Sequence, residues 1–288
     1  MAQVTIGLPI YNGADHLDGA LASLCAQNFD DLCILISDNA STDATPDIVA
    51  KWAANDKRIV SYRQKENIGS VGNFNWLIEN AESPWFMYGA HDDYWSDNYV
   101  KALHAVLMTH PDAELAVGTM VTLFENGKEH NRFPYPVKAN DAPNLAKQRL
   151  LLRYAASGWF HGLYDREKLI EVRHDIKGFD YTWSRDFILM LSFLLSGKTV
   201  GATEAVYYKR ETPVSENLYR PKTLREQCML YIAFVKQALA ILKVAPLSKG
   251  QRFRLLPALM SYAGCRTRTR LLRLVRMSVT APFQRVES

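Results

Sequence analysis

Three carboxylates follow short apolar runs, and their type and spacing could do chemistry. Asp38 follows the run LCILI, and the adjacent pair Asp92 and Asp93 follows PWFMY. Two neighbouring carboxylates repel each other unless a cation or hydrogen-bond donors compensate their charge. A divalent ion such as Mg²⁺ or Mn²⁺ prefers hard oxygen ligands, often one or two carboxylates plus substrate phosphates. The alternative interpretation of the pair is a solvated acidic turn before the next helix.

Asp38 has two interpretations as well. A carboxylate after a strand can accept hydrogen bonds from a ribose or from a base N–H, and it can also shape its own loop as an Asx turn within SDNAST. A dinucleotide-binding oxidoreductase carries an acid at a similar place. However, the first turn reads LPIYNG and has no GxGxxG, which argues against a nicotinamide cofactor.

The elements that must position these residues follow from a repeating pattern. Apolar runs end near Ile10, Ile36, Tyr62 and Tyr88, roughly 26 residues apart, which is the length of a βα unit. Segments with helical periodicity lie between them. The pattern predicts an α/β fold with a mostly parallel sheet flanked by helices. Right-handed crossovers then bring the carboxyl ends of the strands to one edge.

Ligands bind at this edge of open α/β sheets, so we expect the polar residues just past the strand ends to converge there. These residues are Pro9, Tyr11, Asn12, Asp38, Asn67, Asp92 and Asp93.

The segments LPIYNG, SDNASTDAT and ENIGSVGNFNWLIENA, followed by the Asp92–Asp93 turn, resemble the family 2 glycosyltransferases of the GT-A fold. The match covers about residues 4–210. The resemblance implies an inverting enzyme that moves one sugar from a nucleoside-diphosphate sugar to an acceptor hydroxyl, with a divalent metal (Mn²⁺ or Mg²⁺) as cofactor. It also implies a place in bacterial surface polysaccharide or glycolipid assembly. Ala90 stands where relatives often carry an acid, which leaves open which carboxylate binds the metal.

The resemblance assigns roles to the residues at the strand ends. Pro9, Tyr11 and Asp38 would contact the nucleoside. Asp92 would contact its ribose or diphosphate, and Asp92 or Asp93 would bind the metal. Asn12 and Asn67 lie in the matched segments and are expected at the donor site.

Inversion by a single displacement needs a general base beside the acceptor hydroxyl. By resemblance this base is Asp186 in WSRDFILML, with Asp180 as the second choice. The alternative for Asp186 is an ordinary acid in the first turn of a helix. Trp159 and His161 lie where relatives line the acceptor site. The alternatives are core packing for Trp159 and a hydrogen-bonded structural role for His161.

The C-terminal part differs in charge from the rest. Residues 249–288 carry nine Lys or Arg and one acid, Glu287, although the whole chain has a net charge of only +4. We predict a catalytic domain over residues 1–214 and a basic helical extension over residues 215–288. An amphipathic basic helix in the tail, with Arg266, Arg270, Arg273 and Arg276 on one side, could lie on an anionic membrane. It could equally pack against the catalytic domain.

The remaining expectations concern partners and location. The predicted partners are a nucleotide-sugar donor and a glycan or lipid-linked glycan acceptor, and no nucleic acid is expected. Four widely spaced cysteines without a CxxC pair, and no signal-peptide pattern, predict a cytoplasmic protein that could be peripheral at the inner membrane face. Two other functions remain open: a sugar-phosphate nucleotidylyltransferase, although LPIYNGAD lacks its Gly-rich basic loop, and a non-catalytic nucleotide-sugar-binding protein.

Overall fold

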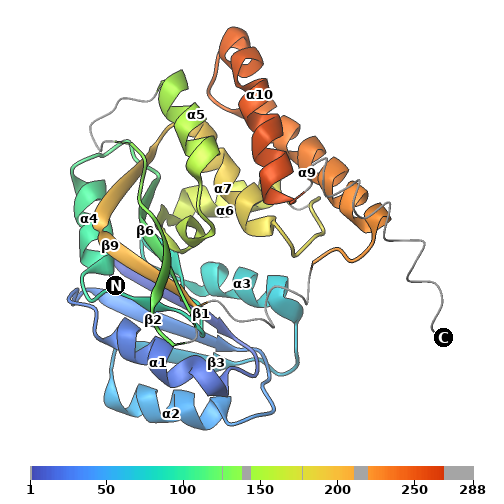
Figure 1. The fold of residues 1–288 in the computed structure, drawn as a ribbon. Helices are drawn as coiled ribbons and strands as arrows, with labels where there is room; N and C mark the ends of the chain where they lie inside the picture. Colours follow the sequence, from blue (N-terminus) through green and yellow to red (C-terminus); the bar gives the residue numbers. More distant parts are fainter. Residues whose placement is uncertain (1, 125, 138–143, 177, 211–219, 269–288) are drawn as a thin grey trace, which may run out of the picture. The chain divides into compact units, whose positions relative to one another are not determined.

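The computed structural model describes most of the chain, which Figure 1 colours from blue to red along the sequence. The described residues are 2–124, 126–137, 144–176, 178–210 and 220–268.

The chain forms two compact units. Unit 1 comprises Met1–Asp141, Ala156–Glu171 and Lys198–Glu211, and unit 2 comprises Ala142–Ala155, Val172–Gly197 and Thr212–Ser288. The chain therefore passes between the units several times. The predicted boundary at residue 214 divides the chain once, between a catalytic domain and a basic extension, whereas the compact units are each made of several segments. The predicted boundary stays a prediction.

Unit 1 begins with the alternating strands and helices that the apolar runs predict. The elements are β1 (Val4–Ile10), α1 (Ala14–Cys25), β2 (Leu32–Asp38), α2 (Thr45–Asn55), β3 (Ile59–Arg63), α3 (Gly69–Asn80) and β4 (Trp85–Tyr88). Strands β3, β2, β1 and β4 are neighbours in this order, and each pair is parallel. Figure 1 shows α1 and α2 on one face of these strands and α3 on the other. The carboxyl ends of the four strands therefore lie along one edge.

The rest of unit 1 extends the same sheet. Its elements are β5 (Tyr94–Trp95), α4 (Tyr99–Met108), β6 (Leu115–Leu123), β7 (Glu129–Phe133), the 3-10 helix η1 (Ser157–His161), β8 (Leu163–Asp165) and β9 (Thr199–Arg210). In the described residues, nine strands form one sheet in the order β3-β2-β1-β4-β8-β6-β9-β5, with β7 paired to β6. β8 is antiparallel to both β4 and β6, whereas β9 is parallel to β6. The predicted α/β fold class is confirmed, and the parallel pairs are those among the first four strands and the pair β6–β9, while the other described pairs are antiparallel.

The turn-forming segments NRFPYP and NDAPN predict a loop over residues 125–144, but strand β7 lies inside this range. All five of its residues are exposed, and its sequence, EHNRF, has no alternation of buried and polar positions. Pairing with β6 through backbone hydrogen bonds is what makes this segment a strand. A pattern of side chains does not reveal such a strand, because the backbone makes the contacts.

Strand β9 contains a bulge opposite β6, and this bulge sets the register of the C-terminal end of β9. Gly118 of β6 pairs with Ala202, but the next residue, Thr119, pairs with Val206. The residues between, 203–205, bulge out of the ladder, and Thr119 Oγ1 donates a hydrogen bond to the Thr203 carbonyl at 2.9 Å. Because an odd number of residues is inserted, the alternation of side chains is reset beyond this point.

Replacing Gly118 with alanine is expected to lower the free energy of unfolding by about 1–3 kcal/mol, as overpacking of a core does. A Cβ at this position would lie 2.4 Å from the carbonyl oxygen of Ala205, which belongs to the bulge. Urea denaturation measures the effect. The control is Gly250→Ala, where a Cβ meets nothing within 4 Å. Equal stability of Gly118→Ala and the wild type would contradict the prediction.

Unit 2 is helical. Its helices are α5 (Leu145–Tyr154), the end of α6 (Arg166–Asp175), α7 (Arg185–Ser196), α9 (Leu224–Val244) and α10 (Lys249–Arg266). Helices α9 and α10 both begin with a capping box, formed by Thr223 with Glu226 and by Ser248 with Gln251. Buried side chains such as Leu230, Phe234 and Leu259 form its core. By length and composition α9 could cross a membrane, a property that it shares with core helices of soluble proteins.

Candidate functional site

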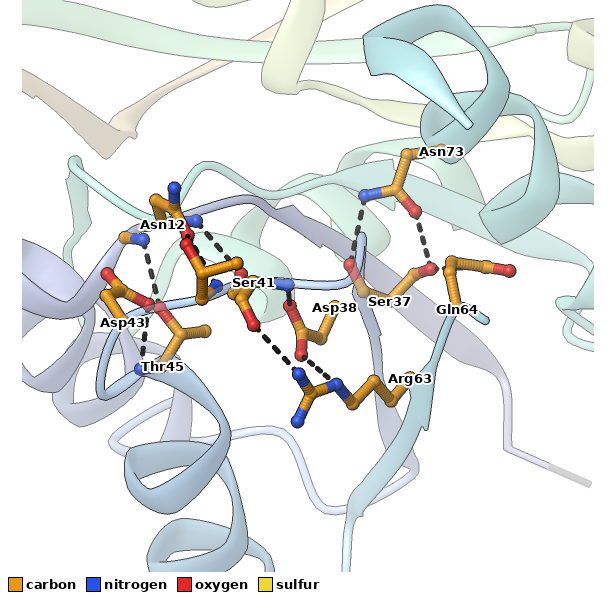
Figure 2. A network of polar contacts seen from close by, with 11 residues as sticks. Asn12, Ser37, Asp38, Ser41, Asp43, Thr45, Arg63, Gln64 and Asn73 are labelled. Carbon is orange, nitrogen blue, oxygen red and sulfur yellow. Dashed lines mark hydrogen bonds and ion pairs between the residues drawn. The ribbon is translucent and has the colours of Figure 1, made fainter. Parts of the chain in front are cut away.

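The loops that follow β1 and β2 are joined by hydrogen bonds (Figure 2). Asn12 has a left-handed backbone conformation with φ 50°. Its side-chain Oδ1 accepts a hydrogen bond from the Thr42 backbone amide at 2.8 Å, and its backbone amide donates to Ser41 Oγ at 2.9 Å. The Gly13 amide donates to Thr45 Oγ1 at 3.0 Å. The Asn12 side chain therefore shapes the loop. Its contact with a donor stays a prediction.

Asp38, the last residue of β2, is 3% exposed, and its two carboxylate oxygens have different contacts (Figure 2). Its Oδ1 accepts a hydrogen bond from the Ser41 amide at 3.0 Å. Its Oδ2 is buried and forms an ion pair with Arg63 Nε at 3.5 Å, but it accepts no hydrogen bond. A buried polar atom without a hydrogen bond is costly, so Asp38 Oδ2 is suited to accept an N–H or O–H from a ligand.

A second group of polar side chains ties α3 and the end of β3 to β2, and the sequence analysis does not single it out. Asn73 Nδ2 donates to the Ser37 carbonyl at 3.0 Å, and Ser37 Oγ donates to Asn73 Oδ1 at 2.5 Å. Gln64 Nε2 donates to Ser37 Oγ at 2.9 Å. These residues are buried (Figure 2). Their one sequence signal is a hydroxyl or amide side chain close to an apolar run.

Asn67 holds the loop in front of α3. Its Oδ1 accepts hydrogen bonds from Asn39 Nδ2 at 2.9 Å and from the Gly69 amide at 2.9 Å. Asn39 Oδ1 in turn accepts from the Ile68 amide at 2.9 Å. The loops after β2 and β3 are therefore linked. A direct role of Asn67 in donor binding stays a prediction.

Pro9 and Tyr11 lie at the end of β1. Pro9 is opposite Ser37 of β2 in the parallel ladder. Tyr11 is just past the strand, and 47% of its surface is exposed. An exposed aromatic ring at the carboxyl edge can stack on a planar base. This placement is compatible with the predicted contact to a nucleoside.

The turn after β4 approaches the loop after β1. A Cβ on Gly13 would lie 2.6 Å from Cδ2 of His91, so the absence of a side chain at Gly13 lets the His91 ring lie against the loop. Burial lowers the pKa of His91, while the charges of Asp92 and Asp43 act in the opposite direction. Since β1 lies between β2 and β4, Asp38 and Asp92 flank the same strand end. The polar residues that follow β1, β2, β3 and β4 therefore lie at one edge, and their roles there stay predictions.

Asp93 is engaged with β9. It is 5% exposed, and the Tyr207 hydroxyl donates a hydrogen bond to its Oδ2, while the Arg210 amide donates to Oδ1 at 2.8 Å. Burial, and then the charge of Asp92, raise the pKa of Asp93 to about 7. Both carboxylate oxygens therefore hold the turn against the C-terminal end of β9.

The two acidic residues of this turn differ as metal ligands. Among the described residues no three His, Cys, Asp or Glu side chains are grouped so that they could hold a metal ion. A Mg²⁺ or Mn²⁺ ion bound by one carboxylate and substrate phosphates needs no such group. Asp92 is partly exposed and fits this arrangement, whereas the oxygens of Asp93 are already hydrogen-bonded.

Trp159 and His161 lie inside unit 1. Trp159 is 1% exposed and packs near Tyr135, with ring centroids 5.6 Å apart, so it has no free face for a sugar. His161 Nδ1 lies 2.8 Å from the Tyr88 carbonyl oxygen, and its ring stacks on Tyr207 at 4.6 Å. Burial lowers the pKa of His161 to about 4, so its ring is neutral near pH 7. Trp159 is therefore packed in the core and His161, which is partly exposed, is hydrogen-bonded to the backbone, while their predicted place at an acceptor site stays a prediction.

Asp186 and Asp180 belong to unit 2. Asp186 is in the first turn of α7, after Ser184, which adopts the left-handed conformation with φ 68°. Asp186 is partly buried, and Asp180 is exposed. Their roles as base stay predictions.

Solved structures with a similar arrangement identify the class of the fold. Residues 1–349 of S. aureus TarS in complex with UDP-GlcNAc match with a TM-score of 0.75 and 18% identity, over 98% of this chain and 78% of that chain. The mannosyltransferase PcManGT from Pyrobaculum calidifontis, in complex with GDP-Man and Mn²⁺, matches with a TM-score of 0.52 and 17% identity, over 99% of this chain and 81% of that chain. The sheet and these likenesses define a GT-A glycosyltransferase fold.

The family follows from the sequence comparison. A model of glycosyl transferase family 2 matches residues 5–169, and the chain belongs to this family. An uncharacterized glycosyltransferase of Rickettsia bellii (strain RML369-C) is 26% identical over 62% of this chain and 25% of its own length. Glycosyltransferase GlyA of Streptococcus pneumoniae is 27% identical over 43% of this chain and 18% of its own length. The matched part thus spans about a quarter or less of these two relatives.

Proposed function

We propose that this protein transfers a single sugar, with inversion, from a nucleoside-diphosphate sugar to the hydroxyl of a glycan or lipid-linked glycan acceptor. The observation that carries the proposal is the buried Oδ2 of Asp38, which lacks a hydrogen bond at the edge where Asp92 also lies. Such an atom is suited to an N–H or O–H of a nucleoside. The exposed ring of Tyr11, the residue after Ile10, which pairs with Asp38 in the ladder, supports the same ligand class.

In this proposal Asp92 is the carboxylate that holds the divalent metal, together with oxygens of the diphosphate. When bound, the metal neutralises charge that develops on the leaving diphosphate. Asp93 positions Asp92 by fixing the turn to β9 through Tyr207 and Arg210. Asp186 is the proposed base that accepts the proton of the acceptor hydroxyl.

A donor-hydrolysis assay with Mn²⁺ and a panel of UDP-, GDP- and dTDP-sugars tests the proposal. Metal-dependent release of nucleoside diphosphate from one donor supports a glycosyltransferase. Tight binding of a donor in a thermal-shift assay without turnover, with or without candidate acceptors, would favour a non-catalytic binder. Synthesis of a nucleotide sugar from a sugar phosphate and a nucleoside triphosphate would favour a nucleotidylyltransferase.

Asp38→Asn is expected to weaken donor binding by about tenfold to a hundredfold, because loss of a hydrogen bond to a charged group costs about 1.5–3 kcal/mol. Calorimetric titration with the preferred donor measures the change. Asp47→Asn, an acid in the first turn of α2, serves as the control. Unchanged donor affinity in Asp38→Asn would remove Asp38 from the binding site.

We also propose a cytoplasmic location, at the inner face of the cell membrane. All four cysteines are free thiols, which suits a reducing compartment. The arginines of the predicted amphipathic tail helix beyond residue 268 lie outside the described residues. Fractionation of cells that express a tagged chain tests the location, and recovery of the protein in the periplasm would contradict it.

A further inference from the structure

The turn between α9 and α10 exposes two large apolar side chains. Phe253 is 75% exposed and Val244 is 72% exposed, the two highest values among the large apolar residues that the structure describes. The turn is nonetheless well built. Ser248 and Gln251 form a capping box, and Arg252 Nη2 donates to the Ala245 carbonyl at 3.1 Å. The exposed side chains therefore project from an ordered turn, which we call the hairpin tip (residues 243–254).

The charge around the hairpin tip has one sign. Residues 227–268 contain seven Lys or Arg and no Asp or Glu. Three basic residues of the tip are exposed: Lys243, Lys249 and Arg254. In the sequence, Lys243 precedes Val244, Arg254 follows Phe253, and Lys249 lies between them. Protein segments that lie in the interfacial region of an anionic bilayer have the same composition, with apolar side chains surrounded by Lys and Arg.

The apolar exposure continues along α9. An 18-residue window of this helix has a mean hydropathy of 1.4, yet only 33% of the window is buried. Met229, Ile232 and Leu239 are 49%, 64% and 41% exposed. If α9 packed only in the core of unit 2, most residues of such an apolar segment would be buried. The exposed part of α9 therefore extends the apolar surface away from the tip.

Charge distinguishes between the possible occupants of this surface. A second copy that met this surface with its own tip would bring equal positive charge, and residues 269–288 add further arginines and a single acid, so both would be repelled. The start of α9 and the end of α10 lie together at the end of the hairpin opposite the tip, since Gln227 Nε2 donates to the Thr267 carbonyl at 2.6 Å. An anionic lipid surface matches the charge, and it accepts isolated apolar side chains without a shaped pocket.

We propose that the hairpin tip docks on an anionic phospholipid surface. Phe253 and Val244 enter the level of the headgroups, while Lys243, Lys249 and Arg254 contact the lipid phosphates. This inference concerns described residues, is separate from the predicted role of the tail, and does not depend on sugar transfer.

The test is co-sedimentation of the full chain with phosphatidylcholine vesicles, with and without phosphatidylglycerol. The double variant Val244→Ser/Phe253→Ser is expected to bind the anionic vesicles at least about tenfold more weakly than the wild type, because two apolar side chains no longer leave water. Lys249→Gln should weaken binding by about fivefold. Met108→Ser, at a 53% exposed apolar position on α4, is the matched control and should bind as the wild type does.

A second measurement reports insertion directly. In Phe253→Trp the added tryptophan should shift its emission to shorter wavelength with anionic vesicles and not with neutral ones. The proposal is overturned if the wild type does not bind anionic vesicles, or if the double variant binds as well as the wild type. It is also overturned if the control loses as much binding, or if the double variant changes only the oligomeric state.

Discussion

Asp92→Ala is expected to lower Mn²⁺-dependent donor turnover by about a hundredfold or more, the usual effect of removing a group that stabilises developing charge. Asp92 is the partly exposed carboxylate in the turn after β4, and in the proposed site it shares the metal with the diphosphate. The loss should be accompanied by a higher Mn²⁺ concentration for half-maximal activity. Steady-state assays across a Mn²⁺ series measure both quantities.

Asp93→Ala serves as the comparison, because its expected effect is of another kind. The Tyr207 hydroxyl would be left buried without its acceptor, which costs about 1–3 kcal/mol of folding free energy. Asp93→Ala should therefore lower the denaturation midpoint, whereas Asp92→Ala should leave it almost unchanged. Asp15→Ala, an exposed acid in the first turn of α1, should change neither quantity. If Asp93→Ala keeps its stability but loses Mn²⁺ dependence, and Asp92→Ala does not, the two roles are reversed.

Asp186→Asn is expected to lower the turnover number for sugar transfer by about a hundredfold or more, as removal of a general base does. The KM for the donor should stay the same, because unit 1 supplies the proposed donor contacts. Asparagine keeps the size and hydrogen-bonding oxygen of the side chain, so α7 should still form. A thermal melt checks that the variant is folded.

The matched variant is Asp180→Asn, at the second choice for the base. It should transfer sugar at the wild-type rate. If Asp180→Asn loses turnover and Asp186→Asn keeps it, the base is Asp180. If both variants are fully active, the base lies elsewhere and the reading of this segment is wrong.

Much of the fold could be predicted from the sequence because its signals are local. The runs VTIGLPI and LCILI became β1 and β2, and the spacing between runs matched βα units. Connections between parallel strands are right-handed, which brings the carboxyl ends of the strands to the same edge of the sheet. The sequence was therefore enough to predict that Asp38 and Asp92 lie at one edge. Strand β7 was missed because backbone pairing, rather than a side-chain pattern, makes it a strand.

Residue types and their spacing were enough to predict the fold class, the family and the edge of the sheet that carries the polar residues. The contacts of each side chain at this edge became visible only in the folded protein. Asp92 and Asp93 are neighbours in sequence, yet one is partly exposed and the other is buried against Tyr207, a residue 114 positions away. Trp159 likewise packs in the core because of Tyr135. The physical reason is that burial and hydrogen bonding depend on partners distant in the chain, and residue type and spacing do not specify these partners.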